Sequence, residues 1–115
     1  MNLLNETKNA IEESGHTPAD IIFIGSKESG HCCTWDQFQT LADVEYYNGF
    51  GSQKVAEDLI IAFSDGSTLW RKEYDGSECW EFSQPFQMPP ETKPISRLVV
   101  PTDRTGWESL AEINA

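Results

Sequence analysis

The sequence has little positive charge, few cysteines and no long hydrophobic run, and each shortage excludes a class of protein. Among its 115 residues, 8 Lys and Arg stand against 19 Asp and Glu, which gives a net charge of −11. DNA, RNA and anionic membranes repel so acidic a chain, and we expect it to bind none of them directly. No stretch approaches the ~20 apolar residues that cross a bilayer. The first residues lack the basic and apolar regions of a signal peptide, so we expect a cytosolic protein.

The three cysteines do not have the spacing of a disulfide framework or of a metal site. Cys32 and Cys33 are adjacent, so a bridge between them would be strained, and a reduced chain is the better interpretation. No Cys-x-x-Cys pair is present, and adjacent residues of a strand point to opposite faces. We therefore predict no metal site and no cofactor.

The composition nevertheless predicts one folded domain. Hydrophobic residues make up 38% of the chain, and 4 Trp, 3 Tyr and 6 Phe are too many aromatics for a disordered acidic tail. A chain of this length closes one hydrophobic core. We predict a single α+β domain over residues 1–84, extending to about residue 100. Residues 85–115 are expected to form a proline-rich segment and a short C-terminal helix.

The first half of the chain is expected to form two helices and two short strands. Apolar residues recur at helical spacing in residues 2–14. Residues 20–25 are a short β-branched run that predicts a buried strand, with residues 31–34 pairing back on it. A capping box at residues 34–37 indicates the start of a second helix, predicted over residues 35–47.

A three-stranded antiparallel meander is the strongest local signal. Residues 55–63, 68–74 and 78–82 are strand-like runs separated by two Asp-Gly turns. We expect an antiparallel sheet of four or five strands centred on residues 55–83, with one face packed against the helices at 2–14 and 35–47.

The pattern leaves the register of this meander open. If both turns are two-residue loops, Ile61 faces Trp70 and Trp80 faces Arg71. A bulged loop at the second turn instead sets Trp80 beside Lys72. A shift of one residue exchanges the two faces of the sheet, so the choice decides which side chains are buried.

The end of the chain changes character. Five of the six prolines lie in residues 85–101, where they prevent a helix and discourage a central strand. Residues 95–100 are predicted to add one edge strand. A second capping-box pattern at 105–108 predicts a short helix with Trp107 on its apolar side, which either docks on the core or stays mobile.

Residues 69–82, which read LWRKEYDGSECWEF, resemble a family of small, largely uncharacterised phage and prophage proteins. That family shares a pattern like L-x-R-x-E-Y-D-G-S-E-W-W-E-F, and Cys79 departs from its first Trp. Segments at 34–38, 47–51 and 58–61 are also similar to the family, so the resemblance covers roughly residues 15–97. It implies a phage or mobile-element origin and supplies no established activity and no catalytic residues. In size and charge, the chain is similar to phage proteins that block host defence, such as anti-CRISPR and anti-restriction proteins.

The acidic residues are concentrated in the family-like part of the chain. Residues 36–81 hold ten acidic and three basic side chains, a net charge of −7. Such a segment is either a solvated surface or an acidic face that attracts a basic partner. The predicted binding residues are the acids Asp65, Glu73, Asp75, Glu78 and Glu81 with the aromatic anchors Tyr47 and Tyr74. The aromatics expected in the core are Trp35, Phe38, Phe63, Trp70, Trp80 and Phe82.

These features together predict a binding protein and not an enzyme. Clustered carboxylates without a convergent pocket signal do not indicate acid–base catalysis. We expect a phage-encoded acidic protein of the host cytosol that inhibits or modulates a host nucleic-acid-handling or defence complex. The alternatives are an immunity or antitoxin-like protein that neutralises a basic toxin, and an accessory or virion protein of the phage. In each of the first two cases the partner is a protein with a basic surface.

Overall fold

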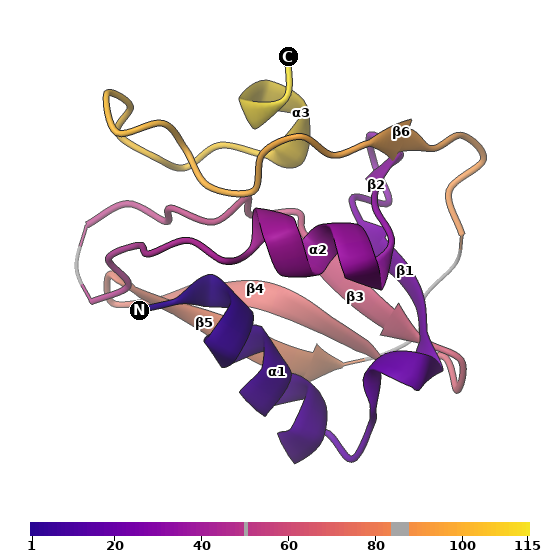
Figure 1. Cartoon of the computed structure of the whole chain (residues 1–115). Coiled ribbons are helices and arrows are strands. Elements are labelled where there is room, and N and C mark those ends of the chain that lie inside the picture. Colours follow the sequence, from indigo (N-terminus) through magenta and orange to yellow (C-terminus); the bar gives the residue numbers. More distant parts are fainter. Residues whose placement is uncertain (50, 84–87) are drawn as a thin grey trace.

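A computed structural model describes residues 1–49, 51–83 and 88–115 and has an α+β fold, as the sequence predicts (Figure 1). The described residues form one sheet in the order β5-β4-β3-β1-β2-β6, antiparallel except for the pairing of β2 with β6. Its strands are β1 (Ile21–Gly25), β2 (His31–Cys32), β3 (Ile60–Phe63), β4 (Thr68–Tyr74), β5 (Ser77–Ser83) and β6 (Lys93–Pro94). The helices are α1 (Leu3–Glu13), the 3-10 turn η1 (Pro18–Asp20), α2 (Trp35–Leu41) and α3 (Leu110–Ile113). No helix of the described chain is long and apolar enough to cross a membrane.

The helix α1 forms as predicted and lies across the β5 end of the sheet (Figure 1). The side chain of Asn2 caps it by accepting a hydrogen bond from the amide of Asn5. Its buried stripe is Leu3, Thr7 and Ile11, spaced by four residues. This stripe packs on the sheet and is also hydrogen-bonded to it, because the indole N–H of the core residue Trp80 donates to Thr7 Oγ1 at 3.0 Å.

The second helix is shorter than predicted. Thr34 forms the expected capping box, but α2 ends at Leu41 and not at residue 47. The chain after it runs beside the start of α1, where the amides of Leu3 and Leu4 donate to carbonyls of residues 44 and 42. These amides are the unpaired donors of a helix N-terminus, and the carbonyls of residues 42 and 44 satisfy them where the chain leaves helical geometry after the C-cap residue Ala42.

The first hairpin is built on a three-residue loop, not on the two-residue loop in the predicted register. The amide of Phe63 donates to the carbonyl of Ser67, and Gly66 adopts φ +90°. This is a type I turn followed by a left-handed glycine. Ile61 consequently pairs with Leu69, and the predicted pairing of Ile61 with Trp70 is wrong by one residue.

The second hairpin adopts the two-residue alternative. Asp75 and Gly76 have φ of +52° and +86°, as a type I′ turn requires. Arg71 therefore pairs with Trp80, and the bulged alternative is wrong. With this register, Arg71 and Trp80 lie on the sheet face that α1 covers, while Trp70 lies on the other face.

Two of the aromatics expected in the core are only partly covered. Trp70 and Phe82 keep 37% and 47% of their surface exposed, whereas Phe38, Phe63 and Trp80 are buried and Trp35 is half-buried. For Trp70 the register is the cause, because its side chain stands on the face opposite α1. Phe82 lies on the α1 face, opposite Leu69 and near the end of β5.

The C-terminal third belongs to the same core as the rest. Val55 and Val99 form only an isolated bridge, so β3 begins at Ile60 and not at residue 55, and the predicted edge strand at 95–100 does not form. The helix α3 is capped by Ser109, four residues later than predicted, and Trp107 precedes it. The apolar residues that this segment adds to the core are Ile95, Leu98, Val100, Leu110 and Ile113. Of the two outcomes considered for the C-terminal helix, it therefore docks on the core.

Candidate interaction surface

A buried ionic network occupies the space between α1 and the β4–β5 hairpin. Arg71 donates to Glu6 Oε2 at 3.1 Å, to the Tyr46 hydroxyl at 2.9 Å and to Glu78 Oε1 at 3.0 Å. The Arg71 side chain is 0% exposed and that of Glu78 is 2% exposed. The guanidinium also lies 4.9 Å from the ring centroid of Trp80. One cation thus joins α1, β4, β5 and the segment after α2 that holds Tyr46.

Glu78 acts in this network as a structural residue. Its second oxygen accepts from the amide of Lys54, and Oε1 also accepts from the amide of Val55 at 3.0 Å. The carboxylate thereby holds the long segment between α2 and β3 against the hairpin. Glu78 was predicted to belong to an exposed acidic face, and the fold places it inside the protein.

The network also perturbs the ionisation of its members. Burial, with the neighbouring Glu6, raises the pKa of the Tyr46 phenol well above its usual range, against the opposing effect of Arg71. Burial by itself would lower the pKa of Arg71, but Tyr46, Glu6 and Glu78 outweigh it and the pKa is raised. Arg71 is therefore a permanent buried cation.

The other predicted acids do not form one face. Glu73 and Asp75 lie at the β4–β5 turn, where Glu73 accepts from the amide of Gly76 at 2.7 Å. Glu81 lies in β5 and pairs with Lys72 at 3.4 Å across the hairpin. Asp65 lies in the other turn, at the opposite end of β4, which the strand rise places ~23 Å away for seven residues.

The two predicted aromatic anchors are both exposed. Tyr74 is the last residue of β4, next to the turn, and Tyr47 lies in the segment that follows α2. That segment runs beside the start of β5, because the amide of Glu78 donates to the carbonyl of Asn48 at 3.1 Å. The structure therefore brings Tyr47 to the hairpin end that carries Tyr74.

Asp65 is instead part of a small polar cluster at the end of α1. His16 stacks on Phe63 with ring centroids 4.0 Å apart, and its Nε2 lies 2.8 Å from Asp65 Oδ2. Hydrogen bonds from Ser67, followed by that of His16, hold the pKa of Asp65 well below its usual range. The cluster fixes the β3–β4 turn to the segment after α1.

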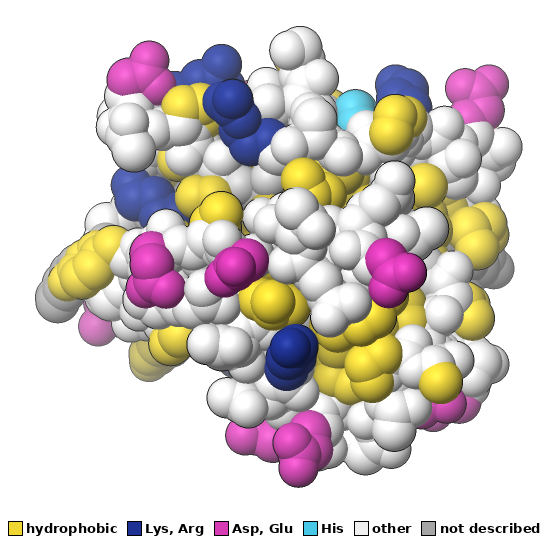
Figure 2. Space-filling model, in the orientation of Figure 1, with side chains coloured by type: hydrophobic (Ala, Val, Ile, Leu, Met, Phe, Trp, Pro, Cys, Tyr) yellow, Lys and Arg dark blue, Asp and Glu magenta, His cyan; other side chains and the backbone are white. Residues whose placement is uncertain are grey.

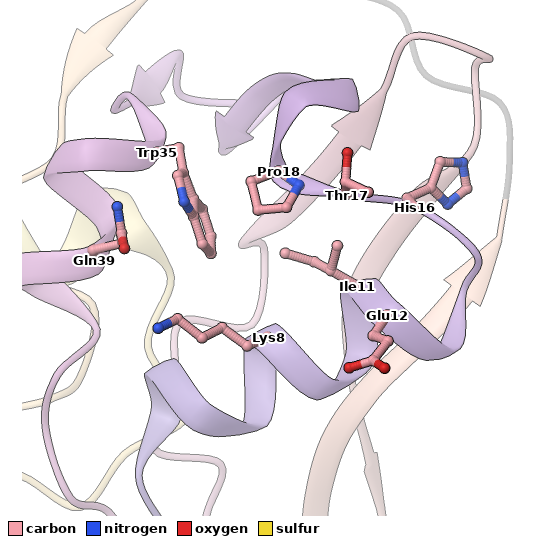
Figure 3. A pocket seen from close by; sticks show the side chains of 8 residues that line it. All are labelled: Lys8, Ile11, Glu12, His16, Thr17, Pro18, Trp35 and Gln39. Carbon is pink, nitrogen blue, oxygen red and sulfur yellow. The ribbon is translucent and has the colours of Figure 1, made fainter.

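An open cleft of about 410 Å³ lies between α1, η1 and α2. Figure 3 shows Trp35 and Gln39 of α2 on one side and Lys8 of α1 facing them across the opening. The remaining lining residues are Ile11, Glu12, His16, Thr17 and Pro18. The cleft has an aromatic wall, one cation and one carboxylate, and the sequence pattern does not indicate it.

A second feature missed by sequence reasoning is a groove between α1 and the edge strand β5. Two cavities of about 400 and 260 Å³ adjoin there and share Ala10, Glu13 and Trp80 as lining residues. We call this the α1–β5 groove. The sequence carries a partial signal, because Asn5, Asn9 and Glu13 lie four residues apart on one polar stripe of α1.

The cysteines and histidines do not come together. Within the described ranges, no group of three His, Cys, Asp or Glu side chains is placed to hold a metal ion. Burial, with a smaller effect of Cys32, raises the pKa of the Cys33 thiol to about 12. Cys79 is exposed on β5.

Comparison with known proteins found no family model, no curated protein and no solved structure that matches this chain.

Proposed function

We propose that this protein is a non-catalytic, acidic binding protein whose partner is a protein with a basic surface. The observation that carries the proposal is the distribution of exposed charge. Of the 19 carboxylate side chains, twelve are exposed, against five of the 8 Lys and Arg. Opposite surface charge accelerates association with a basic partner and excludes acidic ones.

The cations that remain exposed are unevenly placed. In Figure 2, most Lys and Arg side chains lie in the upper half of the view, where Figure 1 shows the C-terminal segment, while acidic side chains are spread over the whole view. Hydrophobic side chains gather between α1 and α2, where the cleft lies. Such a mixed, mostly acidic surface supports contact with a protein more than with a polyanion.

The resemblance to phage proteins makes the partner class more specific. We propose a host nucleic-acid-handling or defence complex, because such complexes carry basic surfaces that normally contact nucleic acid. Inhibition or modulation would follow from occupying that surface. A basic toxin is the alternative partner, since the charge argument supports an antitoxin equally.

The test is affinity capture with the tagged full chain from a bacterial host lysate, in a series of salt concentrations. We expect basic proteins to be recovered at low salt and to be lost well above ~0.15 M, where the Debye length falls below ~8 Å. Capture that is unchanged by salt, or recovery of acidic proteins alone, would contradict the proposal. Identification of a nucleic-acid-handling complex or of a toxin separates the two partner classes.

A matched pair of variants tests whether the hairpin turn takes part. Asp75→Lys and Glu57→Lys change the net charge equally, and both side chains are exposed. Asp75 lies in the β4–β5 turn, while Glu57 lies by the segment that leads to α3, its amide donating to the carbonyl of Glu108. We expect Asp75→Lys to slow association more than Glu57→Lys. Equal effects would show that only the total charge acts.

A further inference from the structure

The strand β5 is at the edge of the sheet, and the register shows which of its backbone groups face outward. Tyr74 and Ser77 close the type I′ turn, so they form a hydrogen-bonded pair, and the pairs of Cys79 and Glu81 with β4 follow at intervals of two. The amides and carbonyls of residues 78, 80 and 82 therefore point away from β4. The bond from the amide of Glu78 to the carbonyl of Asn48 confirms this direction.

Among residues 1–49, 51–83 and 88–115, those that bond to the outward groups of β5 do so at its start. The segment carrying Asn48 takes the amide of Glu78, and Ser77 donates to the carbonyl of Gly49 at 3.2 Å. Among the described residues, none bonds to the outward amide and carbonyl of Trp80 or Phe82. Edges of sheets are usually protected, because unpaired backbone groups invite another strand. The described part of the chain leaves this stretch of β5 unpaired on its outer side.

The open edge adjoins the α1–β5 groove. Trp80 lines both of its cavities, and Phe82 lines the larger one. A strand added to this edge would lie beside α1, and alternate side chains would point toward the helix. There they would meet the exposed stripe of Asn5, Asn9 and Glu13. Hydrogen-bonding groups and one carboxylate are thus placed along the path of such a strand.

We propose that the free edge of β5 is the docking site for an extended, basic segment of the protein partner. About three residues of that segment would pair with residues 80–82, beyond the part of β5 that the Asn48 segment covers, by main-chain hydrogen bonds as in β-strand addition. Basic side chains pointing toward α1 would contact Glu13, and those on the other face would contact Glu81. This inference deepens the proposed function and depends on it.

Charge argues against a second copy of this chain as the occupant. Two copies would bring net charges of −11 together. In an edge-to-edge pairing, the carboxylates of Glu13 and Glu81 would approach their own equivalents, and like charges on paired strands are destabilising. A basic peptide reverses the sign of the same contacts.

The probe is a short synthetic peptide of alternating Lys and Val, labelled for fluorescence anisotropy and titrated with the full chain. Two control peptides accompany it: one of alternating Glu and Val, and one with the Lys–Val sequence N-methylated at alternate backbone amides. We expect the Lys–Val peptide to bind and both controls to fail. N-methylation keeps the charge and removes the hydrogen bonds, so the edge pairing is tested without altering the protein.

Two matched pairs of variants test the site from the protein side. Phe82→Pro and Phe82→Ala both remove the ring, but only proline removes the outward amide hydrogen, which the β4 ladder does not use. We expect Phe82→Pro to bind the peptide about tenfold more weakly than Phe82→Ala. Glu13→Gln and Glu12→Gln each remove one negative charge, and Glu12 lines the cleft on the other side of α1. We expect only Glu13→Gln to weaken binding, about threefold.

Hydrogen exchange of the backbone amides gives an independent result. In the free protein, the amides of Trp80 and Phe82 should exchange faster than those of Cys79 and Glu81, which lie inside the ladder. The Lys–Val peptide should slow the hydrogen exchange of the Trp80 and Phe82 amides. Concentration-dependent protection of that pair without peptide would show that a second copy occupies the edge, and would overturn the proposal.

The remaining outcomes separate this inference from the proposed function. If lysate capture recovers a basic partner but the peptide does not bind, or binds the two Phe82 variants equally, the edge site is refuted and the proposed function stands. If neither the peptide nor any basic protein binds at low salt, the proposed function fails and the edge site fails with it.

Discussion

Replacing Arg71 with Met should destabilise this protein more than any other single change of a charged residue in the β4–β5 hairpin. Arg71 is the only cation within bonding distance of Glu78 in the described structure, and the Glu78 side chain is 2% exposed. Without Arg71, the Glu78 charge stays buried and is held only by the amides of Lys54 and Val55. Methionine fills much of the volume of the arginine side chain. The lost stability should therefore come mainly from the uncompensated Glu78 charge and not from a cavity.

The magnitude follows from the geometry. Breaking a buried ion pair by removing one partner costs about 3–5 kcal/mol, a large share of the ~5–15 kcal/mol that stabilises a typical domain. For a chain of this length the melting temperature should fall by roughly 10–20 °C. Urea unfolding followed by tryptophan fluorescence measures the free energy of unfolding, and Trp80, which contacts Arg71, reports the local change.

The neighbouring residue provides the control. Lys72 pairs with Glu81 on the other face of the same hairpin, with both side chains well exposed to solvent. Lys72→Met should therefore cost less than about 1 kcal/mol. The double variant Arg71→Met with Glu78→Gln should be more stable than Arg71→Met alone, because it removes the uncompensated charge. A loss at Arg71 no larger than that at Lys72, or a double variant less stable than Arg71→Met alone, would refute the buried network.

Three further predictions concern other parts of the molecule. The depressed pKa of Asp65 means that its contribution to stability is present above about pH 4 and is lost as the pH falls below that value; Asp65→Asn should therefore reduce the drop in melting temperature on acidification, and an unchanged drop would contradict the hydrogen bonds that Asp65 accepts from Ser67 and His16. Because partial burial raises the pKa of Cys33 to about 12, iodoacetamide at neutral pH should alkylate the exposed Cys79 before Cys33, as mass spectrometry of brief reactions would show; equal rates would contradict the partial burial of Cys33. Leu110→Ala should cost about 2–5 kcal/mol in urea unfolding, because Leu110 is fully buried in the core; a neutral effect would mean that α3 does not dock.

Features decided by local chemistry were predictable from the sequence. The helix α1 has its cap and its apolar stripe within ten consecutive residues, and the start of α2 is specified by Thr34 and Gln37 alone. The presence of the second hairpin follows from Asp75-Gly76, a dipeptide that tolerates the two left-handed positions of a type I′ turn, whereas the choice between this turn and a bulged loop stayed open.

Features decided by distant residues were not predictable. Both hairpins contain Asp-Gly, yet the first forms a three-residue loop that shifts Ile61 by one position. The end of α2 depends on acceptors for the α1 amides, and those amides lie about forty residues earlier in the chain. The C-terminal segment packs into the core through side chains such as Leu98 and Leu110, which no local periodicity connects.

The predicted acidic face failed to form for a related reason. Acidic residues close in sequence were expected to share a surface. Glu78 instead points inward, where its carboxylate accepts hydrogen bonds from Arg71 and from two amides of the segment before β3. Asp65 is separated from Glu73 and Asp75 by the whole length of β4. The open edge of β5 was equally hidden from the sequence, because strand order is a property of the assembled sheet.

The burial of Glu78 leaves the net negative charge outside the network almost unchanged. The buried network holds two carboxylates, Glu6 and Glu78, together with one guanidinium, so it accounts for only one of the eleven net negative charges. The rest of the molecule still carries the excess that should attract a basic partner. What changes is the place proposed for the contact with the partner, which moves from an acidic face to the edge of β5. The network fixes the hairpin against α1, and a rigid β5 edge beside that helix is what strand addition requires, because a preformed edge loses little conformational entropy on binding.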